Sequence, residues 1–331
     1  MQVTGRMPTA GLRALLGNSL DYAGFFPPAR LTLDQATKNY AGYSRGPDAW
    51  FLGRFVCPVH RLAELDPYVS LFSHSVPLLI SALALPIPTW RESIPRLEES
   101  LDLILRFQRS HAPRVRVDSV EIALPPDSEG LRGLVEIREL IPAAANVVEQ
   151  SGVSDVTPFF EVTASDWFSQ GPAAIDSIAR HNQAWTGVHC RPAAFKLRTG
   201  SVRAEAFPSI DRVAFVINAC AGTGVRLKCT AGLHHPFRHY DGSVATTVHG
   251  FLNVFAGAVL VHARSLESSD LPSALEDDQR AHFRFFEDGL AWNDACADID
   301  QIESARRDLI VSFGSCSFEE PLKDLEKLDI L

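Results

Sequence analysis

The chain has 331 residues, a hydrophobic fraction of 46% and a mean hydropathy of +0.01, values that exclude an intrinsically disordered protein. Its 31 Lys and Arg against 40 Asp and Glu give a net charge of −9. General nucleic-acid binders and binders of anionic membranes need a basic surface, so we expect neither partner. The acidic excess lies at the C-terminal end, because residues 265–331 hold 17 acidic and 6 basic residues.

The spacing of the cysteines and the N-terminal segment indicate the cellular compartment of the protein. The six cysteines are at least nine residues apart, so the chain has no CxxC pair and no zinc-ribbon spacing. Scattered single cysteines are typical of a reducing compartment. The first 18 residues contain no sustained apolar core, so we expect no signal peptide and a cytoplasmic protein.

Short apolar runs recur along the chain, and each is followed by a longer segment. The runs lie at 20–26, 52–57, 77–83, 119–124, 158–163, 193–197, 225–229 and 309–314. Amphipathic or proline-initiated helices are predicted between and after them, at 91–108, 172–184, 209–221 and 319–331. Strands that are apolar throughout and alternate with helices indicate a parallel sheet buried on both faces, and eight such units predict a closed (β/α)8 TIM barrel.

The main alternative to the barrel is an open doubly wound sheet. Such a sheet usually has a glycine-rich turn after its first strand, and LDYAGFFPP has none. We therefore expect a single barrel domain over 1–331. Within it, 243–308 is interpreted as the seventh helix plus an acidic helical insertion between strands 7 and 8, with helices at 248–264 and 271–287. A competing interpretation makes Gly250–Phe255 the eighth strand.

Two of the five lysines lie inside apolar strands, Lys196 in AAFKLRTG and Lys228 in VRLKCTAG. Consecutive barrel strands are neighbours, so the two ammonium groups would repel each other. Repulsion and desolvation both lower the pKa of a lysine. A neutral amine attacks carbonyl carbon and forms a Schiff base. The alternative is that both lysines form structural ion pairs with Asp21, Glu121 or Glu161.

Other polar residues lie at predicted strand ends, where barrel enzymes carry their sites. Glu121 in VDSVEIALP is a candidate proton relay beside a lysine, and Asp21 is a candidate for ordering the same network. The turn FGSCSFEEP at 313–321 joins a strand to a helix and is a candidate anion site. No pattern pairs Cys316 with a particular histidine.

Six segments follow one another in a familiar order: LDYAGFFP at 20–27, FVCP at 55–58, DSVE at 118–121, KLRTG at 196–200, KCTAG at 228–232 and FGSCS at 313–317. Together they resemble the deoxyribose-phosphate aldolase family, class I aldolases with the (β/α)8 fold. The resemblance touches six of the eight strands. It departs from the family where Arg198 replaces a small hydroxyl residue, and where AGLHH at 231–235 replaces paired glycines.

The resemblance implies roles for particular residues. Lys196 corresponds to the Schiff-base lysine, Lys228 to the second lysine that depresses its pKa, and Glu121 to the proton-relay aspartate. We therefore predict Lys196, Lys228, Glu121 and Asp21 as catalytic. The predicted substrate-binding residues are Arg198, Thr199, Gly200, Thr230, Gly232, His234, His235, Glu161, Gly314, Ser315 and Ser317.

The first hypothesis is thus a Schiff-base-forming lyase acting on a small carbonyl or phosphorylated sugar-like substrate, with an anionic small molecule as partner and no cofactor or metal. A second is a metal-assisted barrel enzyme that uses His234, His235 and Glu161. A third is a barrel without catalysis that serves as a binding module through its acidic insertion. By analogy with other barrels of this size, a homodimer is expected.

Overall fold

Eight parallel strands close into one barrel in a computed structural model that describes residues 7–126, 130–164 and 166–331. Around the barrel they follow the order β1-β13-β7-β6-β5-β4-β3-β2. Their bounds are Leu20–Tyr22 (β1), Leu52–Pro58 (β2), Leu78–Leu83 (β3), Val115–Ala123 (β4), Thr157–Glu161 (β5), Ala194–Arg198 (β6), Arg226–Thr230 (β7) and Ile310–Ser315 (β13). The predicted (β/α)8 fold is confirmed, and the open doubly wound sheet is wrong.

The barrel strands are apolar on both faces because one face fills the barrel and the other meets the helices. In β2, the consecutive residues Phe55, Val56 and Cys57 are all buried, and in β7 Leu227 and Cys229 are fully buried. A strand that alternated polar and apolar residues would expose one face to water instead. This double burial explains why each strand was visible in the sequence as a continuous apolar run.

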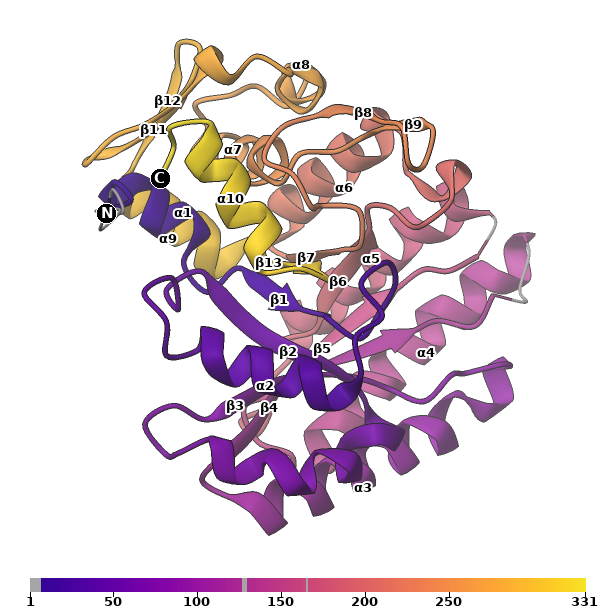
Figure 1. Ribbon diagram of the computed structural model, residues 1–331. Coiled ribbons are helices and arrows are strands. Elements are labelled where there is room, and N and C mark those ends of the chain that lie inside the picture. Colours follow the sequence, from indigo (N-terminus) through magenta and orange to yellow (C-terminus); the bar gives the residue numbers. More distant parts are fainter. Residues whose placement is uncertain (1–6, 127–129, 165) are drawn as a thin grey trace.

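Helices surround the barrel (Figure 1). Their bounds are Ala10–Leu16 (α1), Leu33–Tyr43 (α2), Ser93–His111 (α3), Gly130–Gln150 (α4), Trp167–Ala184 (α5), Ile210–Thr223 (α6), Phe251–His262 (α7), Leu271–Glu276 (α8), Ile299–Asp308 (α9) and Glu319–Lys327 (α10), with 3₁₀ turns at Val59–Leu71 (η1), Trp90–Glu92 (η2), Ala204–Ala206 (η3) and Arg280–His282 (η4). Among the described residues, no helix is both long and apolar enough to cross a membrane.

The predicted helices are present, with some differences at their ends. α5 begins at Trp167 rather than at Pro172, which lies inside the helix. α6 has both expected end signals: the Ser209 side chain accepts a hydrogen bond from the Arg212 backbone N–H, and Gly224 adopts the left-handed conformation at its C-terminus. α10 ends at Lys327, before the end of the predicted helix.

The segment between β7 and β13 differs from the expected helical insertion. α7 is present, so Gly250–Phe255 is not a strand, and nearly all of α7 is buried. Much of the rest is sheet: an antiparallel pair of His239–Asp241 (β8) with Thr246–Val248 (β9), and an antiparallel sheet of Phe283–Phe285 (β10), Gly289–Trp292 (β11) and Ala295–Asp298 (β12). Figure 1 shows both in orange at the upper edge of the view.

The helix predicted at 271–287 therefore ends at Glu276. Two features stabilise the sheet that follows α8. Asn293 has a positive φ of 49° and lies in the two-residue turn between β11 and β12, a conformation that asparagine tolerates well. The Trp292 indole N–H donates to the Asp277 carboxylate, which fixes the sheet to the end of α8.

Candidate active site

Five predicted site residues converge inside the barrel. Lys196 on β6 is in register with Lys228 on β7 and with Glu161 on β5. Glu121 on β4 and Asp21 on β1 face the same interior. All five side chains are buried, with residue exposures of 0 to 6%. Buried charges are costly unless they are paired, so their partners decide the chemistry of the site.

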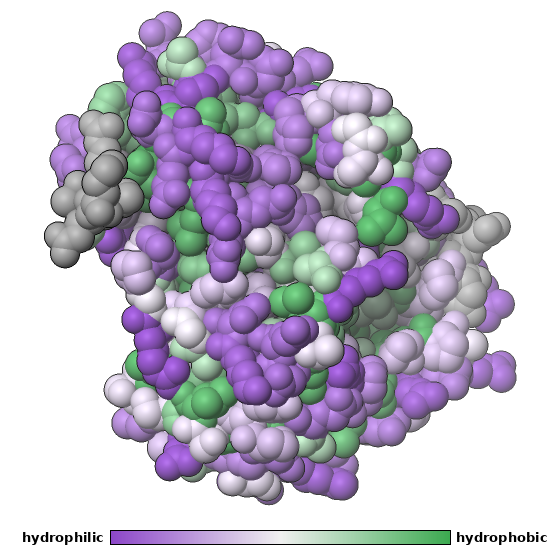
Figure 2. Space-filling view, in the orientation of Figure 1, coloured by the Kyte–Doolittle hydropathy of each residue, from purple (hydrophilic) through white to green (hydrophobic). Residues whose placement is uncertain are grey.

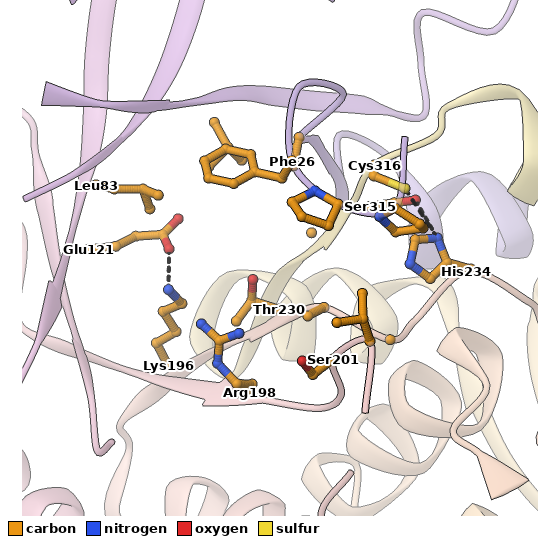
Figure 3. A pocket seen from close by; sticks show the side chains of 18 of the residues that line it. Phe26, Leu83, Glu121, Lys196, Arg198, Ser201, Thr230, His234, Ser315 and Cys316 are labelled. Atoms are coloured by element: carbon orange, nitrogen blue, oxygen red, sulfur yellow. Dashed lines mark hydrogen bonds and ion pairs between the residues drawn. The ribbon is translucent and has the colours of Figure 1, made fainter. Parts of the chain in front are cut away.

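Each lysine contacts two carboxylates, and Glu121 bridges both lysines. The Lys196 Nζ atom lies 2.6 Å from Glu121 Oε2 and 2.7 Å from Glu161 Oε2. The Lys228 Nζ atom lies 2.5 Å from Glu121 Oε1 and 2.8 Å from Asp21 Oδ2. Figure 3 shows the Lys196–Glu121 pair at one side of the pocket. The alternative stated above, in which both lysines form ion pairs with these carboxylates, therefore describes the resting site.

This arrangement corrects the expected pKa of Lys196. Burial alone would lower it, but the attraction of Glu121 and Glu161 is stronger and raises the pKa above its ordinary value. The same contacts lower the pKa of Glu121 and of Glu161, although burial acts in the opposite direction on both. The carboxylates thus outweigh any repulsion between the two amines, and Lys196 carries its proton in the resting site.

Two serines complete the hydrogen bonds of Glu121 and Lys228, and neither was selected from the sequence. Ser81 Oγ donates to Glu121 Oε1 at 2.6 Å and accepts from Lys228 Nζ at 2.8 Å. Ser119 Oγ donates to Ser81 Oγ at 2.7 Å. Ser81 thereby uses its one donor and both acceptor positions. Ser81 lies in the apolar strand β3, whereas Ser119 lies in β4 among other polar residues, and neither position marked the network in the sequence.

Asp21 is held by groups on three strands. Its Oδ1 accepts from the Arg54 backbone N–H at 2.7 Å, and its Oδ2 accepts from Ser312 Oγ at 2.7 Å. The Arg54 guanidinium lies 3.6 Å from Asp21 and pairs with Asp118 at 2.5 Å. Burial would lower the pKa of Arg54, but Asp118 and Asp21 raise it. Arg54 and Asp118 thus extend the charge network beyond the residues predicted.

A pocket of about 230 Å³ opens above the lysines. Arg198, Thr230 and Ser315 line it and are last in β6, β7 and β13, so the pocket lies at the carboxyl ends of the strands, where enzymes with this fold carry their active sites. Its other polar or flexible lining residues are Glu121, Lys196, Ser201, Lys228, Gly232, His234, Gly314 and Cys316. Its apolar lining residues are Ala23, Phe26, Pro27, Pro28, Val56, Leu83, Val202 and Ala231.

His234 provides a positive charge at the end of the pocket away from Lys196 (Figure 3). Its Nδ1 atom lies 3.3 Å from Ser315 Oγ, 4.0 Å from Cys316 Sγ and 3.5 Å from Glu320 Oε2. Burial would lower the pKa of His234, but the bonds to Cys316 and Glu320 raise it to about 9. The pairing of Cys316 with His234 was not visible in the sequence.

Thr199 and Gly200 were predicted to bind substrate, but neither lines this pocket. The Thr199 hydroxyl donates to the Ala231 carbonyl at 2.5 Å, and its backbone N–H donates to the Thr230 carbonyl. A Cβ atom on Gly200 would lie 2.8 Å from the Gly232 Cα. Both residues therefore fix the β6 loop against the β7 loop.

His235 and Ser317 also lie outside the pocket. His235 Nδ1 is 2.5 Å from an Asp324 carboxylate oxygen. Ser317 accepts from the Glu320 backbone N–H through its hydroxyl, at the start of α10. Among the described residues, no group of three or more His, Cys, Asp or Glu side chains could hold a metal ion, so the metal-assisted hypothesis has no assembled site.

Arg198 lines the pocket with a side chain that is 52% exposed. Its Nε donates to Glu161 Oε1 at 3.0 Å, so Glu161 connects Arg198 to Lys196. Glu161 and Asp21 do not line the pocket themselves. They contact the lysines that line the pocket, Glu161 with Lys196 and Asp21 with Lys228.

No protein-family model matches the chain, and no curated protein is similar to it. The chain is similar in structure to xylanase B from Clostridium stercorarium F9, with 12% sequence identity, a TM-score of 0.38, and coverage of 93% of this chain and 89% of that one. A likeness this weak does not bear on function. The fold assignment rests on the strand order, and the resemblance to the aldolase family stays a prediction.

Proposed function

We propose that the protein is a Schiff-base-forming lyase of the class I aldolase type, acting on a small carbonyl compound. One observation carries the proposal: Lys196 and Lys228 share Glu121 at the floor of a pocket at the carboxyl ends of the barrel strands. An amine on the pocket floor with a carboxylate in contact is what imine chemistry needs, because the amine attacks and the carboxylate moves protons.

The charge balance of the site suits an iminium ion. A carbonyl compound that enters the pocket can react only when Lys196 transfers its proton to Glu121, 2.6 Å away. The free amine then attacks the carbonyl carbon, and protonated Glu121 returns the proton to the departing hydroxyl as water leaves. The ammonium is thus replaced by an iminium of equal charge. The carboxylates of Glu121 and Glu161 that stabilise the first cation also stabilise the second.

Lys228 and Asp21 have a positioning role in this scheme. Lys228 holds Glu121 Oε1, which leaves Oε2 directed at Lys196. Asp21 compensates the charge of Lys228 at 2.8 Å. Lys228 therefore keeps the carboxylate of Glu121 in one orientation toward Lys196. Because Lys228 also contacts Glu121, Lys196 is not the sole cation that compensates the charge of this carboxylate.

The opposite end of the pocket suits an anionic substituent. His234 is cationic at neutral pH because its pKa is about 9. Ser315 Oγ lies 3.3 Å from its Nδ1 atom, and Gly314 lines the same pocket. A carboxylate or phosphate on the substrate would therefore lie toward His234 while the carbonyl lies toward Lys196.

Reductive trapping tests the proposal. Protein is incubated with a panel of small aldehydes and aldehyde phosphates, reduced with borohydride and measured by intact-mass spectrometry. We expect an adduct on the wild-type protein, none on Lys196→Arg, and an undiminished adduct on Lys38→Arg, whose side chain is exposed. Arginine keeps the cation between the carboxylates but forms no imine. Equal trapping by wild type and Lys196→Arg would overturn the proposal.

A further inference from the structure

A second cavity, of about 330 Å³, adjoins the pocket beyond His234. The two cavities share five lining residues: Pro28, Ser201, Val202, Gly232 and His234. The second is completed by Phe207, His235, Asp241, Ser243, Val244, Val248 and Glu320. Because so many residues line both, a ligand that fills the first cavity can continue into the second without leaving the protein.

The β8–β9 hairpin forms one wall of this second cavity. Asp241 is the last residue of β8 and pairs with Thr246 in β9, while Ser243 and Val244 lie in the connecting turn. The hairpin belongs to the segment between β7 and β13, outside the eight strands of the barrel. Part of that segment therefore encloses space next to the pocket, on the side of His234.

The lining of the second cavity favours an apolar ligand group. Apolar side chains line it from two segments: Val202 and Phe207 from the β6 loop, and Val244 and Val248 from the hairpin. Small-molecule sites are usually lined mostly by apolar side chains, with a few polar groups that orient the ligand.

The charges in the second cavity do not favour an anion. His234 lies 3.5 Å from Glu320, and His235 lies 2.5 Å from Asp324. Asp241 adds a further carboxylate, whose pKa is lowered by its bonds to Ser243. His234 is shared with the first cavity, and an anion placed beyond it would meet the carboxylates of Asp241 and Glu320.

We propose that the second cavity holds an apolar extension of the substrate, an aryl or branched alkyl group carried beyond the reacting carbonyl. This rests on the proposed function, because it takes Lys196 as the reacting amine. Figure 3 shows the order along the pocket: Lys196 at one side, Thr230 and Ser201 between, and His234 at the other. The extension passes between Ser201 and His234, residues that line both cavities.

The hairpin is accordingly a specificity element. Substrates confined to the first cavity do not touch it, whereas longer ones do. Val244 is half-buried in the hairpin turn and has no part in the ion network, so it can be enlarged without altering Lys196 or Glu121. Val188, which is 83% exposed and lines neither cavity, gives a matched control.

The test compares propanal with 3-phenylpropanal in borohydride trapping of wild type, Val244→Trp and Val188→Trp. In wild type, we expect half-maximal trapping at a concentration of 3-phenylpropanal at least about tenfold below that of propanal, because the ring is buried. Val244→Trp should remove this advantage, with propanal changed less than about twofold. Val188→Trp should behave as wild type.

The failures are distinguishable. No adduct with either aldehyde would remove the proposed function itself. Adducts with both aldehydes at similar concentrations in wild type would leave Lys196 chemistry in place and overturn the apolar subsite. An advantage of 3-phenylpropanal that survives Val244→Trp would overturn it equally. If Val244→Trp does not fold, as judged by circular dichroism, the wild-type comparison alone decides between these outcomes.

Discussion

The two ends of the pocket handle charge in different ways. At the floor, Lys196 and Lys228 are buried and each contacts two carboxylates, and each carboxylate oxygen of Glu121 contacts one of the two lysines. At the far end, His234 is partly exposed and faces one carboxylate, that of Glu320. Arg198 lies beside Lys196 but is exposed, and it also faces one carboxylate, that of Glu161. The floor is thus a closed network of paired charges, whereas the far end keeps positive charge accessible to a ligand.

The buried and the exposed charges therefore have different functions. The pairs at the floor offset the cost of burying ions and set the resting proton positions. The more exposed pairs of His234 and Arg198 contribute little to stability, because water screens them. Substitutions in the buried network should therefore affect folding and chemistry together, and substitutions of His234 or Arg198 should affect ligand binding with small effects on folding.

Replacing Glu121 by leucine should have the largest effect. Both lysines would lose their shared partner, which leaves a buried excess of positive charge and costs about 3–5 kcal/mol of unfolding free energy. Urea unfolding at neutral pH measures this. Glu121→Gln, which keeps the shape but loses the charge, is the control and should lose less. A cost below about 1 kcal/mol for Glu121→Leu would contradict a closed network.

Acid should weaken the same network in the wild-type protein. The pKa values of Glu121 and Glu161 are below their ordinary value of 4.5, so their contribution to stability is full above that pH and is lost as the pH falls through the lowered values. Unfolding free energies measured from pH 6 downward should show this loss. In Glu121→Gln the slope should be shallower.

Replacing Arg54 by methionine should cost about 2–3 kcal/mol. The substitution leaves Asp118 without its closest cation, while Asp21 keeps Lys228 and the Arg54 backbone N–H. The effect is smaller than that of Glu121→Leu because only one ion loses its main partner. Urea unfolding again gives the number, and a stability equal to wild type would place Arg54 outside the network.

Replacing His234 by glutamine should remove a pH dependence from the binding of anions. His234 is cationic below its pKa of about 9 and neutral above it, so inorganic phosphate should bind less tightly to wild type as the pH rises through 9. The loss should be roughly fivefold, about 1 kcal/mol. Calorimetric titration at several pH values measures it. His234→Gln should show no such step, and a step of equal size would assign it to another group.

Replacing Arg198 by serine should have the smallest effect on folding. Its side chain is 52% exposed, and its pair with Glu161 is screened by water. We expect a change in unfolding free energy below about 1 kcal/mol. Anion binding should weaken measurably in the same variant. A destabilisation as large as that of Arg54→Met would remove the distinction between the buried network and the exposed pairs.

The sequence was informative where one physical pattern repeats. Every barrel strand is buried on both faces, so each was recognisable as an apolar run, and a lysine or glutamate inside such a run marked the site. Lys196, Lys228 and Glu121 were found in this way. The three carboxylates Asp21, Glu121 and Glu161 were also named as possible ion-pair partners, but which of them contacts which lysine could not be predicted, because this depends on how the side chains meet when the barrel closes.

Two kinds of feature could not be predicted. Ser81 and Ser119 complete the network, yet a serine in a strand has many structural uses and carries no signal of its own. The strands between β7 and β13 are only three or four residues long, too short to establish a period. Residues 277–287 were therefore assigned to a helix on composition, and the hairpin beside the pocket was missed.

The most direct measurement locates the adduct. After borohydride reduction with an aldehyde that reacts, peptide mapping by mass spectrometry identifies which of the five lysines carries it. The account predicts Lys196, with modification that saturates at low aldehyde concentration and is competed by unlabelled substrate. Adducts confined to the exposed Lys38, Lys323 and Lys327, or on Lys228 in place of Lys196, would contradict it.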